Sequence, residues 1–561
     1  MTRRTETHET DIVVVGGGSA GCVLAARLSE NLGLRVLVVE AGRRDRLGVT
    51  RLPAALLWTI GNPRYDWAYT SEPDPTRDGQ TEFWPRGKTL GGSSAINGMI
   101  YIRGAAADYD AWEATGCSGW GWRDVLPLFR GLETADVPDD THRGADGPQR
   151  VSALRWRHKL AADFIASGVA AGIPPNDDLN GAMHEGIGWN QGSTIQGRRH
   201  SAYDAFLAPN LRRGNLSVLD DLLVERLTFT GRRATGLHAR RSDGTPLHVT
   251  ARAGVVLAAG AINSPQLLML SGIGDAAALR RKGIVPVVDV PEVGQNLMEH
   301  PGLYVQAEMT EPTANRETRP LRAACHFARW LARHDGPMSV PTAQALAFFR
   351  STPDMAEPDL QFHLFPYGSS LKGGKRVIPN RNLATILVNL NFPKSRGWLE
   401  LRTADPATPV AIHPRLLEHP DDIETLLHGL AWVRRMAATP PFGPKLRALI
   451  GVPHQDAGPA ADLAFLRTAA RPFYHPAGTC RMGADDRSVV APDLAVRGVE
   501  RLWVADISIF PRHIAGNTNA TALMIGEKAA SLIAGALQET SLHRNPAQAS
   551  TVSRAESWVP A

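Results

Sequence analysis

The stretch DIVVVGGGSAGCVLAARLSENLGLRVLVVE, residues 11–40, decides the fold of this chain. The β-branched run at 11–15 predicts a buried parallel strand, and a helical pattern of apolar residues follows from about Ser19 to Leu32. A glycine ends that pattern, and residues 35–40 predict a second strand. The stretch is therefore one β–α–β unit, which predicts an α/β domain built around a parallel sheet.

Three glycines, Gly16, Gly18 and Gly21, form a GxGxxG pattern between that strand and that helix. The first permits a tight turn, the second lets the backbone approach a pyrophosphate, and the third allows close packing of helix on strand. Glu40 closes the second strand, where a carboxylate accepts the ribose hydroxyls and disfavours a 2′-phosphate. The pattern predicts a Rossmann-like site for NAD or FAD. The alternative is a glycine-rich turn without a ligand.

Composition excludes several classes of protein. The chain has 561 residues and a net charge of only +5, and no long basic run is interleaved with aromatic residues, so nucleic acid is a poor partner. No apolar signal core precedes Asp11, and we expect a cytoplasmic protein without a transmembrane segment. No pair of cysteines has metal-binding or disulfide spacing, so we expect no metal site. The cysteines are Cys22, Cys117, Cys325 and Cys480.

Four further blocks occur along the chain, each rich in glycine, serine or asparagine. They are WPRGKTLGGSSAINGMIYIRG at 84–104, GAINSPQLLMLSGIG at 260–274, YHPAGTCRMG at 474–483 and VADISIFPRHIAGNTNATALMIGEKAA at 504–530. Together they resemble the glucose–methanol–choline (GMC) oxidoreductases over nearly the whole chain. The likeness is strongest to choline-dehydrogenase-like and aliphatic alcohol dehydrogenase members, and it implies that the dinucleotide is FAD.

The resemblance also implies how the chain is divided. A Rossmann-like FAD-binding domain would be assembled from several segments, and a second domain, a mainly antiparallel sheet with helices, would cover the flavin ring. Alternating strands at 359–365 and 384–392 agree with such a sheet. The expected divisions are 1–155, 200–305 and 470–540 for FAD, 156–199 and 306–469 for substrate, and 541–561 as a loose tail.

The same resemblance implies a set of FAD contacts. Some relatives attach FAD covalently through a histidine shortly after the paired glycines. Ile96 stands at that position here and cannot form the bond, so we expect dissociable FAD. The implied cofactor-binding residues are Gly16, Gly18, Ser19, Ala20, Gly21, Glu40, Ala41, Lys88, Gly91, Gly92, Asn97, Gly98, Val224, Ala505, Asp506, Thr518 and Asn519.

The resemblance places the chemistry near the C-terminus. His475 matches the catalytic histidine, and a neutral imidazole suits a general base at physiological pH. Asn517 matches the second active-site position, where an amide donor would stabilise an alkoxide. His363 matches a substrate-side histidine of choline-oxidising relatives. We expect His300 to serve its own loop's hydrogen bonding and His513 to be a structural neighbour.

The expected activity is oxidation of a primary alcohol to an aldehyde by hydride transfer to flavin N5. A quinone or another acceptor would take the electrons. If the acceptor is a quinone, the otherwise cytoplasmic protein could be peripheral to the inner membrane. The alternatives are an oxidase that uses O2, a hydroxynitrile lyase or photodecarboxylase on the same fold, and a flavin-binding protein without turnover. The sequence leaves open the alcohol, which could be choline, aliphatic, aromatic, a sugar or aminoglycoside-like, and also the oligomeric state.

Overall fold

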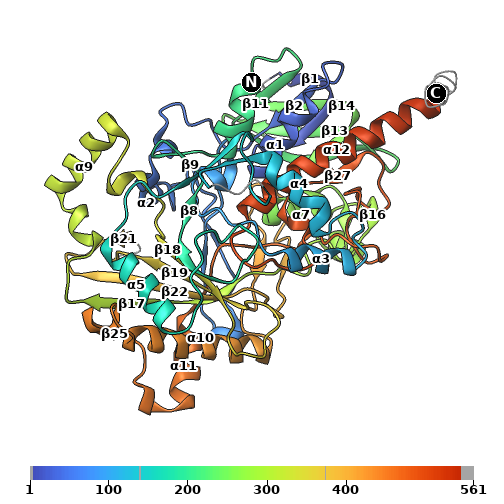
Figure 1. Cartoon of the computed structure of the whole chain (residues 1–561). Coiled ribbons are helices and arrows are strands. Elements are labelled where there is room, and N and C mark those ends of the chain that lie inside the picture. Colours follow the sequence, from blue (N-terminus) through green and yellow to red (C-terminus); the bar gives the residue numbers. More distant parts are fainter. Residues whose placement is uncertain (1–3, 138–140, 373–374, 545–561) are drawn as a thin grey trace, which may run out of the picture.

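Two seven-stranded sheets organise the chain, and the computed structural model describes residues 4–137, 141–372 and 375–544. The first sheet, at the top of Figure 1, has the order β11-β2-β1-β14-β13-β12, and β27 also pairs with β14. Its strands are β1 (Glu6–Val15), β2 (Val36–Val39), β11 (Leu216–Leu219), β12 (Leu222–Thr230), β13 (Arg233–Arg241), β14 (Pro246–Leu257) and β27 (Leu502–Val504).

The long strand β14 takes part in both the antiparallel and the parallel pairing of this sheet. Its first half pairs antiparallel with β13, and its last three residues pair in parallel with β27. On its other edge it runs parallel to β1, which in turn runs parallel to β2. The parallel strands β1, β2, β14 and β27 therefore end at one edge, where ligands bind in open α/β sheets.

Two boundaries of the β–α–β unit differ from those predicted. β1 begins at Glu6 rather than Asp11. Residues Glu6–Thr10 pair with β14, although all five side chains are polar and so give no hydrophobic pattern in the sequence. The helix α1 (Ser19–Leu28) ends four residues before Leu32, where the Ser29 hydroxyl donates to the carbonyl of Ala26 and the chain turns. Backbone pairing sets the start of β1, and a side-chain hydrogen bond marks the end of α1. Neither contact leaves a signal in the hydrophobic periodicity of the sequence.

The second sheet is antiparallel, as predicted, with the order β25-β17-β22-β19-β18-β7 and with β26 also paired to β17. Alternate residues of its strands point to opposite faces. One face forms a hydrophobic cluster with α5 and α10, and the other faces the first sheet's domain. Its strands are β7 (Gly186–Trp189), β17 (Pro301–Met309), β18 (Ala345–Phe349), β19 (Leu360–Phe365), β22 (Leu383–Leu390), β25 (Leu446–Ile450) and β26 (Ala470–Pro472).

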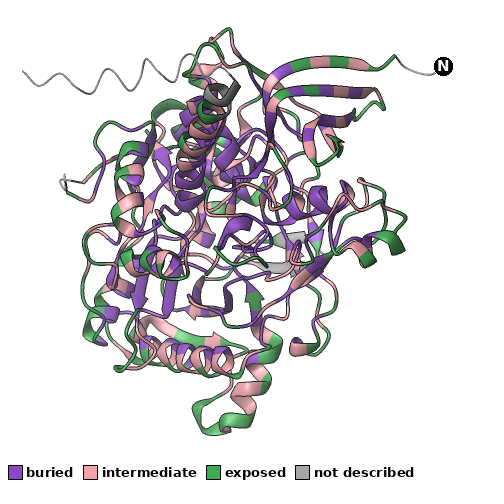
Figure 2. Ribbon diagram, turned by 90° about the vertical axis from the view of Figure 1, so that its right-hand side faces the viewer, coloured by how far each residue is buried: buried purple, intermediate pink, exposed green. Residues whose placement is uncertain are grey.

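Helices cover both sheets, and the remaining strands form small ribbons between them; Figure 2 shows the buried residues gathered in the sheets and their flanking helices. The helices are α2 (Leu56–Thr59), α3 (Ala106–Ala114), α4 (Trp122–Leu132), α5 (Lys159–Ala170), α6 (Ala208–Asn210), α7 (Gly260–Leu270), α8 (Ala276–Arg281), α9 (Pro320–Arg333), α10 (Pro420–Ala438), α11 (Pro459–Ala469) and α12 (Asn519–Arg544). The ribbon strands are β3 (Tyr69–Thr70), β4 (Phe83–Trp84), β5 (Glu133–Ala135), β6 (Gln149–Ala153), β8 (Gln191–Gly192), β9 (Thr194–Ile195), β10 (Arg198–Arg199), β15 (Ile273–Gly274), β16 (Val288–Asp289), β20 (Ser370–Lys372), β21 (Lys375–Val377), β23 (Trp398–Glu400) and β24 (Ala411–His413).

The division into domains stays a prediction, and several elements lie across its proposed boundaries. The boundary at 305 falls inside β17, and β26 of the second sheet begins at Ala470. The β23–β24 ribbon contributes Leu399 and Ile412 to the hydrophobic cluster of the first sheet. The tail predicted from Ser541 begins inside α12, and residues 545–561 lie outside the described residues.

The helix α12 is long and apolar enough, by length and composition, to cross a membrane over Asn519–Glu539. In the structure, 56% of its apolar window is buried inside the molecule. It packs along α1, and α4 also contacts it. Its composition is therefore that of a helix in the core of the first domain.

Candidate active site

A cavity of about 890 Å3 lies between the two sheets. The carboxyl ends of β1 and β2 line it on one side, and β17, β19 and β22 of the second sheet line it on the other. The sequence-predicted residues on its wall are Gly16, Gly18, Ser19, Ala20, Glu40, Ala41, Gly92, Asn97, Gly98, Val224, His363, His475, Asp506, Asn517, Thr518 and Asn519.

Three glycines line one part of this cavity, and the residues present fit an extended dinucleotide. Gly16 has φ +103°, and a Cβ on it would lie 2.5 Å from the carbonyl oxygen of Ala258. A Cβ on Gly92 would lie 2.7 Å from the Cα of Gly18. The two loops thus meet backbone to backbone beside the cavity. A cradle without side chains lets phosphate groups approach main-chain amides.

Two helix N-termini meet at this cradle. α1 begins at Ser19 and α12 at Asn519, and both residues line the cavity. The Ser19 hydroxyl donates to Oδ1 of Asn519 over 2.8 Å, although the residues are 500 positions apart. Free amides and the positive ends of two helix dipoles favour an anion such as a pyrophosphate at this point.

Glu40 lies beside the glycine cradle, directly after β2. Its Oε2 accepts from the backbone N–H of Gly17 over 2.9 Å, and its Oε1 accepts from that of Gly42 over 2.8 Å. Burial raises the pKa of Glu40 to about 7, although these two bonds and the nearby Lys88 oppose the rise. A fixed carboxylate with remaining lone pairs suits the hydroxyls of a ribose.

Asp506 ties the site to the first sheet. Its Oδ2 accepts from the Ser264 hydroxyl over 2.6 Å and from the Gly260 amide over 2.8 Å, and its Oδ1 accepts from the Ser508 amide over 2.8 Å. The carboxylate therefore holds the start of α7 against the loop that follows β27. Its position on the cavity wall is set by these bonds.

The other predicted cofactor residues support the cleft from outside its wall. A Cβ on Gly21 would lie 2.0 Å from the carbonyl oxygen of Gly16, so this glycine permits the close packing expected of it. The Gly91 amide donates to Gly17 over 2.7 Å, and the buried Ala505 amide donates to Leu257 over 2.8 Å. These residues hold the cradle together through their backbones.

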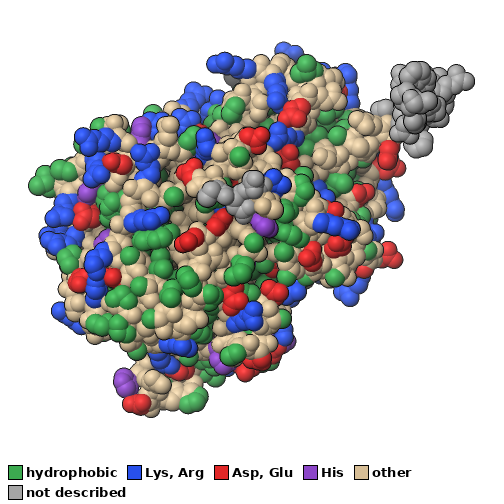
Figure 3. Space-filling model, viewed as in Figure 1, with side chains coloured by type: hydrophobic (Ala, Val, Ile, Leu, Met, Phe, Trp, Pro, Cys, Tyr) green, Lys and Arg blue, Asp and Glu red, His purple; other side chains and the backbone are tan. Residues whose placement is uncertain are grey.

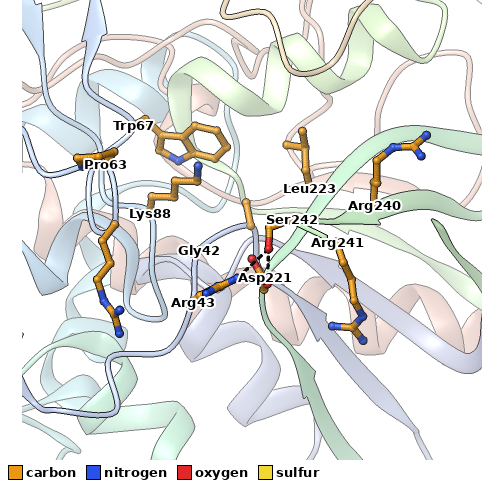
Figure 4. Close-up of a pocket in the computed structure, with 12 residues that line it drawn as sticks. Gly42, Arg43, Pro63, Trp67, Lys88, Asp221, Leu223, Arg240, Arg241 and Ser242 are labelled. Atoms are coloured by element: carbon orange, nitrogen blue, oxygen red, sulfur yellow. Dashed lines mark hydrogen bonds and ion pairs between the residues drawn. The ribbon is translucent and has the colours of Figure 1, made fainter. Parts of the chain in front are cut away.

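Lys88 extends into a second cavity of about 490 Å3, which shares Ala41, Trp67 and Leu223 with the first. Figure 4 shows the Lys88 ammonium beside the Trp67 indole, and its Nζ lies 4.5 Å from the ring centroid. Arg43 pairs there with Asp221 over 3.1 Å. The outer end of the dinucleotide cleft is therefore a mainly cationic opening.

His475 stands on a loop that its neighbours hold through the backbone. Its amide donates to both oxygens of Glu299, over 2.8 and 2.9 Å, and its carbonyl accepts from Nε2 of His513 over 2.9 Å. The preceding residue, Tyr474, has φ +68°, a left-handed conformation that costs energy in a non-glycine residue. Glu299 is buried, and burial raises its pKa to about 8 against the opposing effect of Arg86.

A chain of hydrogen bonds fixes the proton positions on the His475 ring. His300 Nε2 lies 3.1 Å from the carbonyl oxygen of Ile514, so it carries a proton. The pKa of His300 is held well below its usual value, mainly by burial, so its Nδ1 is unprotonated and accepts from His475 Nδ1 over 3.0 Å. His475 Nε2 then has a free lone pair, which faces Asn517 Nδ2 over 3.0 Å.

Asn517 is oriented from its other side. Gln361 Nε2 donates to its Oδ1 over 3.4 Å, so its Nδ2 points to His475. Burial holds the pKa of His475 well below its usual value, with smaller effects from His513, His363 and Arg86. The pair is therefore a neutral base and an amide donor, side by side on the cavity wall.

From the sequence we expected the His300 side chain to bond within its own loop. The structure corrects this expectation, because the ring bonds to His475 and to the carbonyl of Ile514. It contacts His475 across 175 residues of sequence. Two substitutions test its effect on the His475 ring. We expect His300→Leu to lower the rate of flavin reduction by about 10- to 100-fold, the value of one buried hydrogen bond to a reacting group. His300→Asn, which keeps an acceptor near the Nδ1 position, should recover much of that loss.

The pH profile separates this role from a structural one. Because the pKa of His475 is depressed, the neutral base persists as pH falls, and the wild-type rate should stay level from about pH 8 to below about pH 6.5. Stopped-flow traces should show a changed profile in His300→Leu and a preserved one in His300→Asn. Equal losses in both variants with an unchanged profile would contradict the assignment.

His363 lies on the substrate side of the cavity, on β19. Burial lowers its pKa to about 4, an effect that the Asn389 side chain opposes. Neither ring nitrogen makes a hydrogen bond of normal geometry within the described ranges, and the ring lies 5.8 Å from that of Phe473. Residues of the same sheet face also line the cavity: Tyr304, Gln306, Phe365, Thr385 and Leu387.

Sequence reasoning missed Glu299 and Gln361. Glu299 precedes His300 in NLMEHP, and Gln361 stands two residues before His363 on one strand, so it points to the same face. The spacing of two between Gln361 and His363 was the sequence signal that could have identified Gln361.

Among residues 4–137, 141–372 and 375–544, no group of three or more His, Cys, Asp and Glu side chains could hold a metal ion. Cys480 is fully buried, as an apolar residue would be.

A dinucleotide cleft that opens onto a neutral histidine and an amide donor defines a dinucleotide-dependent oxidoreductase. The GMC oxidoreductase family models match residues 10–302 and 393–526. The chain therefore belongs to the GMC oxidoreductase family, whose cofactor is FAD, and it is an oxidoreductase that acts on CH–OH donors.

Individual relatives match over nearly the whole chain. Mitochondrial choline dehydrogenase of Homo sapiens is 40% identical over 538 residues, which cover 94% of this chain and 90% of the relative. Alcohol dehydrogenase [acceptor] of Pseudomonas putida is 38% identical over 547 residues, which cover 95% and 97%. The crystal structure of pyridoxine 4-oxidase from Mesorbium loti has a TM-score of 0.84 at 30% identity and covers 93% and 98%.

Proposed function

We propose that this protein oxidises a primary alcohol to its aldehyde, with His475 as the base and Asn517 as the donor to the alkoxide, and passes the electrons to a quinone. The observation that carries the proposal is the 3.0 Å contact between His475 Nε2 and Asn517 Nδ2 on the wall of the dinucleotide cavity. A hydroxyl oxygen that approaches both nitrogens from the cavity side would donate its proton to Nε2 and accept from Nδ2, in place of their direct contact.

The cofactor would lie along the cleft from Glu40 to Asn517. The Gly16–Gly18 turn and the start of α12 would bind the pyrophosphate, Glu40 the ribose, and the backbone of Val224 the adenine. Bound FAD supplies the hydride acceptor. Ile96 lines the same cavity and has no atom that could bond covalently to the flavin, which supports a dissociable cofactor.

The chain's own groups would arrange the reacting alcohol. The His475 lone pair takes the hydroxyl proton, because its Nδ1 proton is committed to His300. Asn517, held by Gln361, donates to the oxygen as negative charge develops on it. The second sheet covers this end of the cavity with aromatic and apolar side chains. In the whole reaction the alcohol loses two electrons and two protons, and these would reduce a quinone to a hydroquinone.

Charge on the substrate side favours a neutral alcohol over choline. Glu82 lines the cavity, but its carboxylate accepts from Arg77 over 2.7 Å and from Arg471 over 2.8 Å. Glu299 is occupied by backbone amides. In the part of the chain that the structure describes, no other Asp or Glu lines the cavity near the second sheet. A quaternary ammonium would therefore enter without a free carboxylate partner.

An anaerobic titration tests the activity and the substrate together. The flavin spectrum is recorded while alkyl alcohols, aryl alcohols and choline are added separately, and we expect neutral alcohols to bleach it at lower concentrations than choline. One portion is then mixed with air and another with a water-soluble quinone. Faster reoxidation by quinone supports the dehydrogenase; faster reoxidation by air supports an oxidase, which the likeness to pyridoxine 4-oxidase favours. No bleaching by any alcohol would refute the proposal.

A further inference from the structure

One arginine on the cavity wall has hydrogen-bond donors to spare. Arg471, on β26, lines the 890 Å3 cavity, and its side chain is 45% exposed. Its Nη1 donates to Oε1 of Glu82 over 2.8 Å. Within the described ranges, its Nε and Nη2 have no hydrogen-bond partner. A guanidinium presents its N–H groups as a planar fork that matches a carboxylate, so this edge of Arg471 suits an anionic group.

Arg471 points to the same face of the second sheet as the residues on the substrate side. It lies opposite Gly302 of β17, and opposite residues of an antiparallel pair share a face. Tyr304, two residues after Gly302, shares that face and lines the cavity. A Cβ on Gly302 would lie 2.4 Å from Cε2 of Phe473, so the Phe473 ring occupies the space that the glycine leaves. Arg471, Phe473 and Tyr304 therefore form one continuous wall.

This wall leads from Arg471 to the proposed base. Arg471, Phe473 and His475 all line the cavity. Four residues of chain span at most about 14 Å, so the guanidinium and the imidazole can contact the two ends of one small molecule. Between them the Phe473 ring, whose centroid lies 4.9 Å from that of Tyr304, offers an apolar contact. An alcohol with a methylene chain and an anionic far end fits this order of groups.

The charge beside Arg471 is positive, because two arginines share one carboxylate. Oε1 of the buried Glu82 accepts from Arg77 over 2.7 Å as well as from Arg471. Arg77 is fully buried, and its Nε and Nη1 have no partner among the described residues. The cluster of Arg77, Glu82 and Arg471 thus has one positive charge in excess. An incompletely neutralised charge next to a cavity favours an opposite charge inside it.

The molecular surface gives no such preference by itself. Figure 3 shows basic and acidic side chains mixed over this face of the molecule, and the whole chain has a net charge of only +5. Attraction of an anion to the protein at large is therefore weak. A preference for an anionic alcohol would have to come from the wall of the cavity.

We propose that Arg471 binds a carboxylate at the far end of the alcohol, so that the substrate class is an ω-hydroxycarboxylate. The hydroxyl lies at His475 and Asn517, the methylene chain lies along Phe473, and the carboxylate accepts from the unpartnered edge of Arg471. The carboxylate keeps its bonds and its charge while the carbinol carbon is oxidised. This inference rests on the proposed function, because it assigns the other end of the same substrate.

Three alcohols of one length test the charge preference. Anaerobic stopped-flow measurements compare ω-hydroxyhexanoate, α,ω-hexanediol and ω-aminohexanol as reductants of the flavin-loaded protein. We expect apparent dissociation constants that increase in that order, with the carboxylate bound about tenfold more tightly than the diol. Because Arg471 is partly exposed, added salt should weaken the binding of ω-hydroxyhexanoate more than that of the diol.

Substitutions at Arg471 test the assignment to this residue. Arg471→Met should raise the apparent dissociation constant of ω-hydroxyhexanoate about tenfold more than that of the diol. The loss should appear in binding rather than in the limiting rate, because the contact is remote from the reacting carbon. Arg471→Lys keeps the charge without the fork and should recover part of the loss. The matched control is Arg447→Met, on β25 of the same sheet, which is 66% exposed, lies outside the cavity wall and should keep the wild-type order.

Hexanoate, which has no hydroxyl to oxidise, gives a measurement without turnover. It should perturb the flavin spectrum of the wild type and compete with the diol, and Arg471→Met should weaken both effects. Equal binding of ω-hydroxyhexanoate and the diol by the wild type would overturn the inference. A carboxylate preference that survives Arg471→Met would also overturn it and assign the anion to Arg86, on the same wall. In both cases reduction by the diol would leave the proposed function standing. If none of the three alcohols bleached the flavin, the proposed function would fall, whereas hexanoate binding that depends on Arg471 would still support the anion site.

Discussion

His475→Ala should retain FAD and lose the reduction of that FAD by alcohol. A positioned general base contributes about 10²- to 10⁴-fold to such a step, and we expect a loss of that order in the stopped-flow rate. The loop should survive the change, because Glu299 and His513 hold residue 475 through its backbone amide and carbonyl. Flavin content and thermal midpoint, measured on the same sample, would show that the site is otherwise intact.

The matched control for this variant is His454→Ala. Its side chain is 82% exposed and lies outside the cavity, so the change should leave both flavin content and reduction rate unaltered. A His475→Ala protein that bleaches at the wild-type rate would show that another group takes the proton. Loss of flavin from that variant would instead indicate that the ring supports cofactor binding.

Gly92→Ala should weaken FAD binding by about 5- to 150-fold, which corresponds to the ~1–3 kcal/mol of an overpacked contact. The new Cβ would lie 2.7 Å from the Cα of Gly18, at the point where the two loops of the cradle meet. The Cβ position is fixed by the backbone of residue 92 and the atom it meets is backbone, so no side chain can rotate away. The loops must separate, and the amides that face the pyrophosphate move with them.

The control for backbone strain is Gly79→Ala. Gly92 has φ +52° and Gly79 has φ +75°, so both are left-handed, but a Cβ on Gly79 would meet nothing within 4 Å. It should keep wild-type FAD affinity, measured by the ratio of flavin to protein after dialysis. Because Ile96 stands at the attachment position, wild-type flavin should pass a filter after denaturation. Equal affinity in Gly92→Ala and Gly79→Ala would show that the close approach of the loops is not required.

The cofactor half of the site was predictable because its signals are local. A turn that needs glycine, a helix start and an acidic strand end lie within residues 11–40, and each follows from backbone geometry over a few positions. The alternating strands of the second sheet were predictable for the same reason. The start of β1 at Glu6 was not, because polar residues form that end of the strand and pairing with β14 alone holds it.

The catalytic half required the tertiary structure. His475 and Asn517 could be matched from their sequence blocks, but neither block shows which nitrogen of His475 is free. His300 sets it from 175 residues away, and Gln361 orients Asn517 from 156 residues away. A tautomer depends on which donors and acceptors surround a ring in space, and spacing along the chain carries no record of them.

The dinucleotide fold at residues 11–40 and the order of the later blocks were thus determined by the sequence itself, since each depends on residue types at short spacing, and the sequence also predicts His475 as the base. The tertiary structure decided which nitrogen of His475 carries the proton, and it paired the Glu82 carboxylate on the cavity wall with two arginines. These depend on contacts between segments that only the folded chain brings together.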